Sequence, residues 1–520
     1  TVRLELGVAG LTELPADPDH HLIVSVGGQT VGEARWDGPR AHCAAFEFPS
    51  TLLAAGDNVV ELRLPGDLAG VSVDSVILNY ARLAYRARPA AEVDRLAIDV
   101  GTARTVEATG FGPGRVVAVD RTDALRPRWL AGIAADAGTV RFRMPGADAA
   151  SILVAGEGAL RSPLAIEPNA PSALHEISAD WIAIAPALLA DGVAPLADLR
   201  ASEGLRTAVV DLADVYDEFT AGIPDPVAIR AFLAHVGPRF VLLVGDGHWD
   251  PHGYTTAEAD RVPVAMVQLE QYWAASDAWY ATFRGEDPLP DLSIGRLPVG
   301  SAAELAAAVG KIVAWESAGA ADWLARASVV ADNDDGTFDF SRVVRDQAEI
   351  LRAGFDVEEL LLGSVGRRRV KNDLDVAFAD GRYLVAYTGH GDMTSWAAER
   401  LLTANEARRS GTPGRQGLVV AMDCMNGMFH VPGAESMGEA MVRADQAGAV
   451  AFWGSTTLSN PASQEGTFLE FARLLVSPGD RRLGEALGEA TARAWISGLD
   501  NGDVLRGWAL LGYPATRLRR

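Results

Sequence analysis

Two stretches of the chain decide the fold: residues 383–391 read YLVAYTGHG, and residues 417–427 read GLVVAMDCMNG. Each is a nearly continuous apolar run followed by a short polar segment with one reactive side chain, His390 in the first and Cys424 in the second. Strands that are buried on both faces of a parallel sheet have this unbroken apolar character. We therefore expect two central parallel strands, one ending beside an imidazole and the other beside a thiol.

The alternation of apolar strands and amphipathic helices extends over most of the chain after residue 170. Further strands are expected over 182–185, 240–244, 327–331, 357–362 and 449–453, and helices over 227–236, 302–317, 343–353 and 437–444. Such alternation is typical of an α/β region with a mostly parallel sheet. We divide this region near residue 325 into two α/β subdomains, 171–325 and 326–520, and expect the second to carry the reactive pair.

Residues 1–170 follow a different pattern, with short alternating segments between turn signals. The segments are 21–26, 58–64, 73–78, 105–108 and 116–119. Period-2 segments at this spacing predict antiparallel β-sandwiches. We predict a β-sandwich accessory domain over 1–90 and a second β-sandwich-like domain over 91–170, with an exit linker over 162–172. The expected fold class is multidomain, with all-β domains ahead of the α/β region.

Composition and charge exclude several classes of protein. The chain has 520 residues, is 48% hydrophobic and carries a formal charge of −23. This hydrophobic content excludes a disordered chain, and the negative charge argues against nucleic acid as a partner. No apolar run approaches the ~20 residues of a membrane-spanning helix, so no membrane span is expected. The cysteines, Cys43 and Cys424, fall in different predicted domains, so no disulfide is expected.

Polar side chains follow four of the predicted strands of the second subdomain. The segments are 332–335 (DNDD), 388–392 (TGHGD), 423–427 (DCMNG) and 454–457 (GSTT). Because ligands bind beyond the carboxyl ends of parallel strands, these acids, the imidazole, the thiol and the hydroxyls are expected at one edge of the sheet. Ser455 and Thr456 are expected to line a substrate cleft there.

His390 and Cys424 are suited to nucleophilic catalysis. A thiol attacks as its thiolate, and a neighbouring imidazolium lowers the pKa of the thiol. Gly391 lets the backbone approach a substrate, so its N–H and that of Cys424 are candidate oxyanion donors. Cys424 could instead be a small buried apolar residue and His390 a turn residue. Their places at strand ends beside glycines favour catalysis.

The histidine box, 387–391 (YTGHG), and the cysteine box, 424–429 (CMNGMF), together resemble those of the gingipain family of peptidases, in the caspase-like clan. Segments 241–247, 291–299 and 508–514 are similar to other parts of that family. The resemblance covers roughly residues 170–520. It implies a caspase-like fold in which Cys424 is the nucleophile and His390 the catalytic histidine. Gly391 and Cys424 would then be the oxyanion donors.

The resemblance also implies roles for acidic residues and for an ion. Asp334 lies at the place of the acid that orients the family's histidine, with Asp332 as a rival. Asp339 is the nearest candidate for an acid that binds a basic substrate side chain, although Phe340 occupies the matching position. Calcium is expected as a structural ion, with Asp246 and its neighbours as candidates and no ligand set assigned. No required cofactor and no transition-metal site is expected.

The expected function is therefore a cysteine endopeptidase that forms a thioester acyl-enzyme and acts on proteins or peptides. We expect it to be secreted or located at the cell surface, with its signal segment outside this chain, which begins at Thr1. Two alternatives stay open at this point. One is a transpeptidase of sortase-like function with the same fold, and the other is a catalytically silent binding module.

Overall fold

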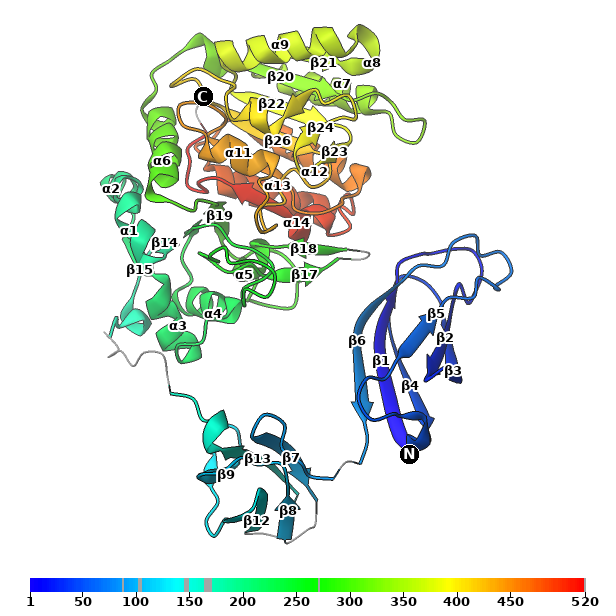
Figure 1. Ribbon diagram of the computed structural model, residues 1–520. Helices are drawn as coiled ribbons and strands as arrows, with labels where there is room; N and C mark the ends of the chain where they lie inside the picture. The colour runs from blue at the N-terminus through cyan, green and yellow to red at the C-terminus, as the bar shows by residue number, and fades with distance from the viewer. Residues whose placement is uncertain (87, 102–104, 145–148, 163–170, 270–271, 519–520) are drawn as a thin grey trace. The chain divides into compact units, whose positions relative to one another are not determined.

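The computed structural model describes the chain except residues 87, 102–104, 145–148, 163–170, 270–271 and 519–520. The chain divides into two compact units, Thr1–Pro168 and Asn169–Arg520 (Figure 1). Most of the linker predicted over 162–172 lies outside the described residues. Each unit is described by itself.

The first part of the N-terminal unit is a β-sandwich, as predicted. Its two antiparallel sheets have the orders β4-β1-β6 and β3-β2-β5. The strands are β1 (Val2–Gly10), β2 (His20–Val26), β3 (Gln29–Trp36), β4 (Ala41–Phe48), β5 (Val60–Arg63) and β6 (Val76–Ala84). Alternate residues of β1 and β2, such as Leu4, Leu6 and Val24, point into one shared core because side chains in a strand alternate between its faces.

The second part of this unit also packs two antiparallel sheets around one core. The sheet orders are β10-β9-β13-β7 and β11-β12-β8. The strands are β7 (Arg95–Val100), β8 (Thr105–Ala108), β9 (Val116–Asp120), β10 (Arg128–Trp129), β11 (Ala134–Asp136), β12 (Thr139–Arg143) and β13 (Ala150–Gly156). Phe142 of one sheet and Ile152 of the other are buried in the same cluster. The all-β fold class predicted for the region ahead of the α/β part is confirmed.

A ten-stranded sheet forms the centre of the C-terminal unit. In spatial order its strands are β15 (Thr207–Asp211), β14 (Trp181–Ala185), β16 (Phe240–Val244), β19 (Ser293–Leu297), β28 (Trp508–Leu511), β27 (Ala451–Ser455), β26 (Leu418–Met422), β22 (Leu384–Thr388), β20 (Arg326–Ala331) and β21 (Asp356–Leu361). Only the β27–β28 pair is antiparallel. The strands from β15 to β28 therefore run opposite to those from β27 to β21.

This sheet is continuous across the boundary that we predicted near residue 325. Strand β28, from the end of the chain, pairs with β19 on one side and with β27 on the other. A single buried cluster also contains residues from both predicted subdomains. The two α/β regions are thus halves of one structural unit, joined by a strand that is remote in sequence from both of its neighbours.

Helices cover the sheet around the strands of interest. Helices α7 (Phe340–Leu351) and α12 (Pro461–Val476) pack on each other and on β20, β22 and β26. Helix α9 (Arg367–Asp380) packs on β21, α11 (Met437–Arg443) on β27 and α13 (Leu483–Ile496) on β19, and α6 (Ala302–Ser317) packs on α11. All residues of β22 and β26 are buried. Their carboxyl ends are therefore rigid supports.

Shorter elements complete this unit. The remaining helices are α1 (Ala187–Ala190), α2 (Ala194–Ser202), α3 (Leu212–Thr220), α4 (Pro226–Val236), α5 (Ala278–Ala281), α8 (Leu362–Val365), α10 (Ala404–Ala407) and α14 (Asp503–Gly507). The remaining strands are β17 (Met266–Gln268), β18 (Trp273–Ala275), β23 (Gly391–Asp392), β24 (Ser395–Trp396) and β25 (Leu402–Thr403). Strands β23, β24 and β25 form a small antiparallel sheet directly after His390.

A buried arginine joins several segments near the sheet junction. Arg296 of β19 is fully buried, and its guanidinium donates to Asp277 at 2.8 and 2.9 Å and to the carbonyls of Gly245 and Val262 at 3.1 and 3.0 Å. It also lies 4.8 Å from the ring centre of Phe429, which follows the cysteine box. Most N–H groups of the Arg296 guanidinium therefore have a hydrogen-bond acceptor. A buried ion pair is tolerated when its hydrogen-bonding groups have partners in this way.

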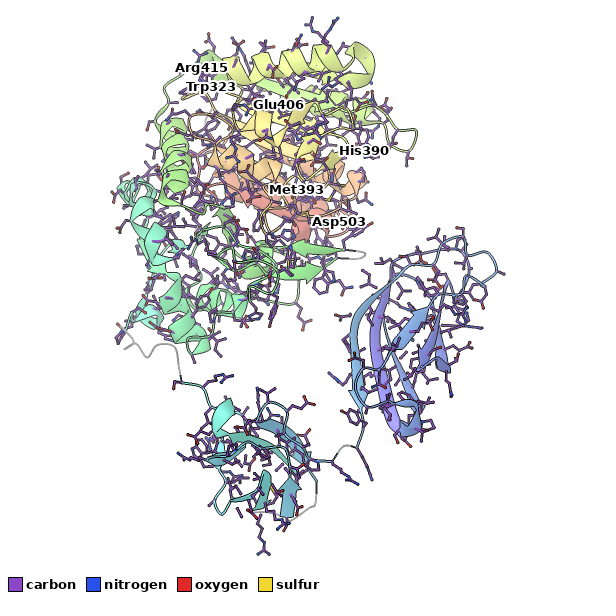
Figure 2. The ribbon with its side chains drawn as sticks, viewed as in Figure 1. Trp323, His390, Met393, Glu406, Arg415 and Asp503 are labelled. Carbon is purple, nitrogen blue, oxygen red and sulfur yellow. The ribbon has the colours of Figure 1, made fainter. Side chains whose placement is uncertain are left out.

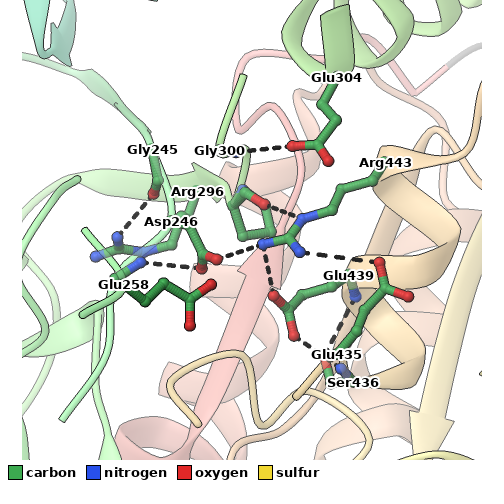
Figure 3. A network of polar contacts seen from close by, with 12 residues as sticks. Gly245, Asp246, Glu258, Arg296, Gly300, Glu304, Glu435, Ser436, Glu439 and Arg443 are labelled. Carbon is green, nitrogen blue, oxygen red and sulfur yellow. Dashed lines mark hydrogen bonds and ion pairs between the residues drawn. The ribbon is translucent and has the colours of Figure 1, made fainter. Parts of the chain in front are cut away.

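A second polar network lies beside it (Figure 3). Arg443 of α11 donates to Asp246 at 2.5 Å and pairs with Glu439 at 2.7 Å, and so joins α11 to the end of β16. Burial raises the pKa of Glu439 to about 8. Asp246, which we considered as a calcium ligand, therefore has an arginine as its counter-ion.

We predict that Arg296→Met lowers the free energy of unfolding of the C-terminal unit by about 3–5 kcal/mol, because Asp277 keeps a buried charge without a counter-ion. Urea unfolding followed by hydrogen exchange at β19 measures this. As a control, Arg352→Met removes a half-exposed pair with Glu359 and is expected to cost at most about 1 kcal/mol. Equal effects of the two changes would contradict the prediction.

Candidate active site

The predicted cluster of strand ends is formed by four neighbouring strands. Strands β20, β22, β26 and β27 are adjacent and parallel, so their carboxyl ends lie at the same edge. Thr388 of β22 pairs with Met422 of β26, and His390 and Cys424 each come two residues after these paired positions. Paired strands are about 4.8 Å apart. The register therefore brings the histidine loop and the cysteine loop side by side.

The backbone at His390 is held by several hydrogen bonds, one of them from the N–H of Ala397 to His390 O at 2.9 Å. The N–H of Gly389 donates to Met422 O at 3.1 Å, across to the neighbouring strand. The N–H of His390 donates to Asp332 Oδ2 at 3.0 Å, and the Tyr387 hydroxyl donates to His390 O at 2.6 Å. The imidazole itself is 61% exposed (Figure 2). A fixed backbone thus carries a ring that is open to solvent.

Asp335, and not Asp334, contacts the ring of His390. The Oδ2 atom of Asp335 lies 3.0 Å from His390 Nε2, and the ring edge packs on Phe340 with centroids 5.2 Å apart. Hydrogen bonds from the N–H groups of Phe338 and Thr337 lower the pKa of Asp335 and keep it ionised. Phe340, which occupies the position that matches the family's specificity acid, packs against the histidine ring.

The role that we expected for Asp334 is therefore corrected. Its Oδ1 atom accepts a hydrogen bond from the N–H of Ser341, in the first turn of α7, at 3.0 Å. Asp332, the rival, holds the backbone of His390 rather than its ring. Three acids share this short turn, and which one faces the imidazole depends on how the turn folds back towards α7. The order of residues alone did not determine that.

Cys424 is presented by a sharp turn. Met425 has a φ of 65°, which is uncommon for a residue with a side chain, and its N–H donates to Thr457 O at 3.0 Å. The half-buried thiol lies 3.9 Å from the carbonyl of Ser459. Strain of this kind persists only where the surroundings hold it, and it is concentrated at functional sites.

The surroundings raise the pKa of Cys424. Burial is the main cause, and the carboxyls of Asp423 and Asp503 add to it. We expected a neighbouring imidazolium to lower this pKa, so the structure differs from that expectation. A raised pKa favours the protonated thiol over the thiolate.

The two expected oxyanion donors are both compatible with that role. Among the described residues, nothing accepts a hydrogen bond from the N–H of Cys424. Gly391 pairs with Trp396, whereas the preceding residue receives a ladder bond from Ala397 at 2.9 Å. Because hydrogen-bonded and non-bonded pairs alternate in antiparallel ladders, the N–H of Gly391 points away from β24.

Three other predicted site residues have structural roles instead. Asp339 is the N-cap of α7 and accepts from the N–H of Arg342 at 2.7 Å. Ser455 and Thr456 are fully buried, and their hydroxyls donate to the carbonyls of Thr457 and Ala275 at 2.7 and 2.8 Å. The prediction that Ser455 and Thr456 line a substrate cleft is corrected, because strand β27 continues as far as Ser455 and both side chains are buried in the core. Substrate binding by Asp339, which is exposed, stays a prediction.

A pocket of about 330 Å³ opens beside the thiol instead. Its lining consists of Leu269, Tyr272, Leu458, Ser459, Asn460, Asn501 and Asp503. Ser459 O, the neighbour of the Cys424 sulfur, belongs to this wall. Asp503 begins α14, and its Oδ2 atom accepts from the N–H of Asn460 at 3.0 Å. Sequence reasoning missed this pocket because its walls come from three distant segments.

No group of three or more His, Cys, Asp and Glu side chains among the described residues could hold a metal ion. Calcium as a structural ion thus stays a prediction. A search of the same residues for a helix both long and apolar enough to cross a bilayer finds none.

Residues 175–519 match the model of peptidase family C25. The chain belongs to this family. Gingipain R2 of Porphyromonas gingivalis strain W83 is 24% identical over 367 residues, which are 65% of this chain and 46% of that protein. Gingipain R1 of Porphyromonas gingivalis is 24% identical over 351 residues, 62% of this chain and 32% of the relative. The chain spans less than half the length of these curated relatives.

Solved structures show the same fold. The Arg specific cysteine proteinase gingipain R has a TM-score of 0.55 at 21% identity, with 68% of this chain and 80% of that one covered. Dimeric latent PorU from Porphyromonas gingivalis has a TM-score of 0.51 at 16% identity, with 99% of this chain and 48% of that one covered. The resemblance to the gingipain family, and the fold that it implied, are confirmed.

We predict that Asp503→Asn speeds alkylation of Cys424 by iodoacetamide roughly threefold at pH 7, as a lowering of the thiol pKa by half a unit would do. Removing the carboxylate charge lowers the pKa of Cys424 and raises its thiolate fraction. Mass spectrometry of the Cys424 peptide measures the rate, with the exposed Cys43 in the same chain as internal reference. An unchanged or slower rate at Cys424 would contradict the prediction.

Proposed function

We propose that the chain is a cysteine endopeptidase in which Cys424 attacks the peptide carbonyl and His390 transfers the protons. The observation that carries this proposal is the pairing of β22 with β26, which sets the histidine and cysteine loops side by side in a member of family C25. The raised pKa of the Cys424 thiol supports a mechanism in which His390 acts as a general base at the moment of attack.

The reaction proceeds in two half-reactions. In the first, the Cys424 thiol loses its proton to His390, and its sulfur bonds to the peptide carbonyl carbon. The N–H groups of Gly391 and Cys424 stabilise the negative oxygen, the C–N bond breaks, and His390 gives its proton to the leaving amine. In the second, His390 takes a proton from water, whose oxygen bonds to the thioester carbonyl carbon. The C–S bond breaks, the carboxylic acid leaves, and His390 returns the proton to the sulfur of Cys424.

Asp335 and Phe340 orient the histidine in this scheme. Asp335 lies 3.0 Å from Nε2, so Nδ1 is the nitrogen left to exchange the proton with the thiol. An ionised carboxylate at Nε2 favours the tautomer with a proton there and stabilises the imidazolium that forms. The edge contact of Phe340 limits rotation of the ring.

We further propose that the pocket beside Cys424 binds the substrate side chain that precedes the scissile bond. Asp503 and the amide side chains of Asn460 and Asn501 offer acceptors, while Leu269 and Tyr272 contribute apolar surface. This combination suits a long side chain with a cationic end. Arginine specificity is stated for the related gingipain R structure. In this chain Asp503 of α14, rather than the earlier candidate Asp339 before α7, would supply the negative charge.

Other parts of the proposal concern partners and location. Membership of a peptidase family supports protein or peptide substrates. We propose a secreted or cell-surface location. Transpeptidation differs from hydrolysis only in the second half-reaction, where an amine replaces water.

Cys424→Ala and His390→Ala are each expected to reduce peptide cleavage at least about 10³-fold with the fold intact, since each removes a member of the reacting pair. Cleavage-site profiling on a peptide library measures this, with circular dichroism as the folding check. Cys43→Ala is the matched control and keeps full activity.

The same library tests the finer parts of the proposal. Asp503→Asn is expected to weaken a preference for basic side chains before the cleaved bond. An added amine that appears in ligated products would identify transpeptidation. Full activity of Cys424→Ala would end the whole proposal.

Asp335→Asn is expected to lower kcat/KM by about 10–100-fold, the usual effect of removing the partner of a functional histidine. Asp334→Asn is the matched control and is expected to change kcat/KM less than about threefold, because an asparagine can still accept the hydrogen bond from Ser341. A larger loss of kcat/KM in Asp334→Asn than in Asp335→Asn would contradict this prediction and indicate that Asp334 orients the histidine.

A further inference from the structure

Asp423 is a buried carboxyl without a hydrogen-bond partner next to the nucleophile. It directly follows β26 and precedes Cys424, and it is only 1% exposed. Among the described residues, neither of its side-chain oxygens finds a partner. The large majority of buried polar side-chain atoms are hydrogen-bonded, so a buried carboxyl without a partner at this place calls for an explanation.

The Asp423 side chain reaches from the cysteine loop to the histidine loop. A Cβ atom added to Gly391 would lie 2.2 Å from Asp423 Oδ2 and 2.6 Å from its Cγ. The carboxyl therefore lies directly against the backbone of the residue after His390. Only glycine leaves space for this contact, which gives Gly391 a packing role besides its proposed role as an oxyanion donor.

Other acids surround this carboxyl. Asp332, after β20, and Asp392, on β23, both raise the pKa of Asp423, although burial is the largest cause. The buried hydroxyl of Tyr387, on β22, is a further titratable neighbour. From α12 the facing group is neutral, because Gln464 donates to the main-chain oxygen of Asp423 at 2.9 Å. None of these neighbours supplies a positive charge.

The neighbouring acids are already engaged in holding the histidine loop. Asp332 accepts the N–H of His390 at 3.0 Å. Asp392 accepts from Thr394 at 3.0 Å and from Ser395 at 2.8 Å, and although burial opposes it, these bonds lower its pKa. Burial also raises the pKa of Asp332. A negative charge at Asp423 would be added beside these two acids in a region shielded from water, where like charges repel strongly.

We propose that Asp423 is a positioning residue whose neutral carboxylic acid keeps the histidine loop packed against the cysteine loop, and whose ionisation separates them. This inference rests on the proposed function, because the consequence is that the catalytic pair is assembled only while Asp423 holds its proton. The step is a simple proton loss to solvent. It makes the enzyme sensitive to alkaline pH through a residue that does not touch the substrate.

Asp423→Asn tests the inference, because asparagine has the shape of the neutral acid and cannot ionise. Cleavage by the full chain is measured as a function of pH. The ratio of variant to wild-type kcat/KM is expected to rise by about tenfold for each pH unit above the point at which Asp423 ionises. A ratio that stays constant with pH overturns the inference.

Two further variants extend the test. Asp392→Asn removes a charge that favours the neutral form of Asp423, so the alkaline loss of activity is expected to move to lower pH. Asp380→Asn, at the exposed end of α9, is the matched control and is expected to leave the profile unchanged. An Asp392→Asn profile identical to that of the control also overturns the inference.

Infrared spectroscopy separates this inference from the proposed function. In Cys424→Ala protein at neutral pH, Asp423 is expected to give a C=O stretching band of a protonated carboxylic acid beside that of Glu439, and only the Asp423 band is lost when Asp423→Asn is added. If the Asp423→Asn variant does not fold, Asp423→Ser is used instead to assign the band to Asp423. Absence of the band overturns the inference alone, whereas activity in Cys424→Ala overturns the proposed function and leaves the band to report on Asp423.

Discussion

The parallel pairing of β22 with β26 is the constraint on which the site depends. Both strands are buried along their whole length, so neither can slide without exposing apolar side chains or unpairing its ladder. The pairing of the two strands fixes where the residues after them begin. The histidine and cysteine loops therefore need only a few further contacts to be ordered. Those contacts come from acids and backbone groups of the neighbouring strand ends.

The strands and longer helices were predictable because local patterning and burial agree along most of the C-terminal unit. The predicted strand 240–244 and helix 302–317 coincide with β16 and α6, and 418–422 coincides with β26. The continuity of the sheet was not predictable in the same way. Strand β28 lies far along the chain from β19 and β27, and an apolar run does not indicate which neighbours it will take.

The site residues that directly follow a buried strand could be predicted from the sequence, and the other site residues could not. His390 and Cys424 follow directly from buried strands, so the sheet determines their positions. Asp335 differs from Asp334 only in the way a turn folds, and the pocket at Asp503 is assembled from distant segments. Ser455 was assigned to a cleft because the end of its strand was placed two residues too early; β27 ends at Ser455 rather than Trp453.

The place of β28 affects how this unit forms during synthesis. The strand that connects the two halves of the sheet is made of residues 508–511, after every other strand of the sheet. A nascent chain on the ribosome therefore has two incomplete half-sheets with open edges at β19 and β27, and such edges pair readily with other chains. The unit is complete only when this last strand has emerged, so nascent chains depend on protection of those edges until translation of the unit ends.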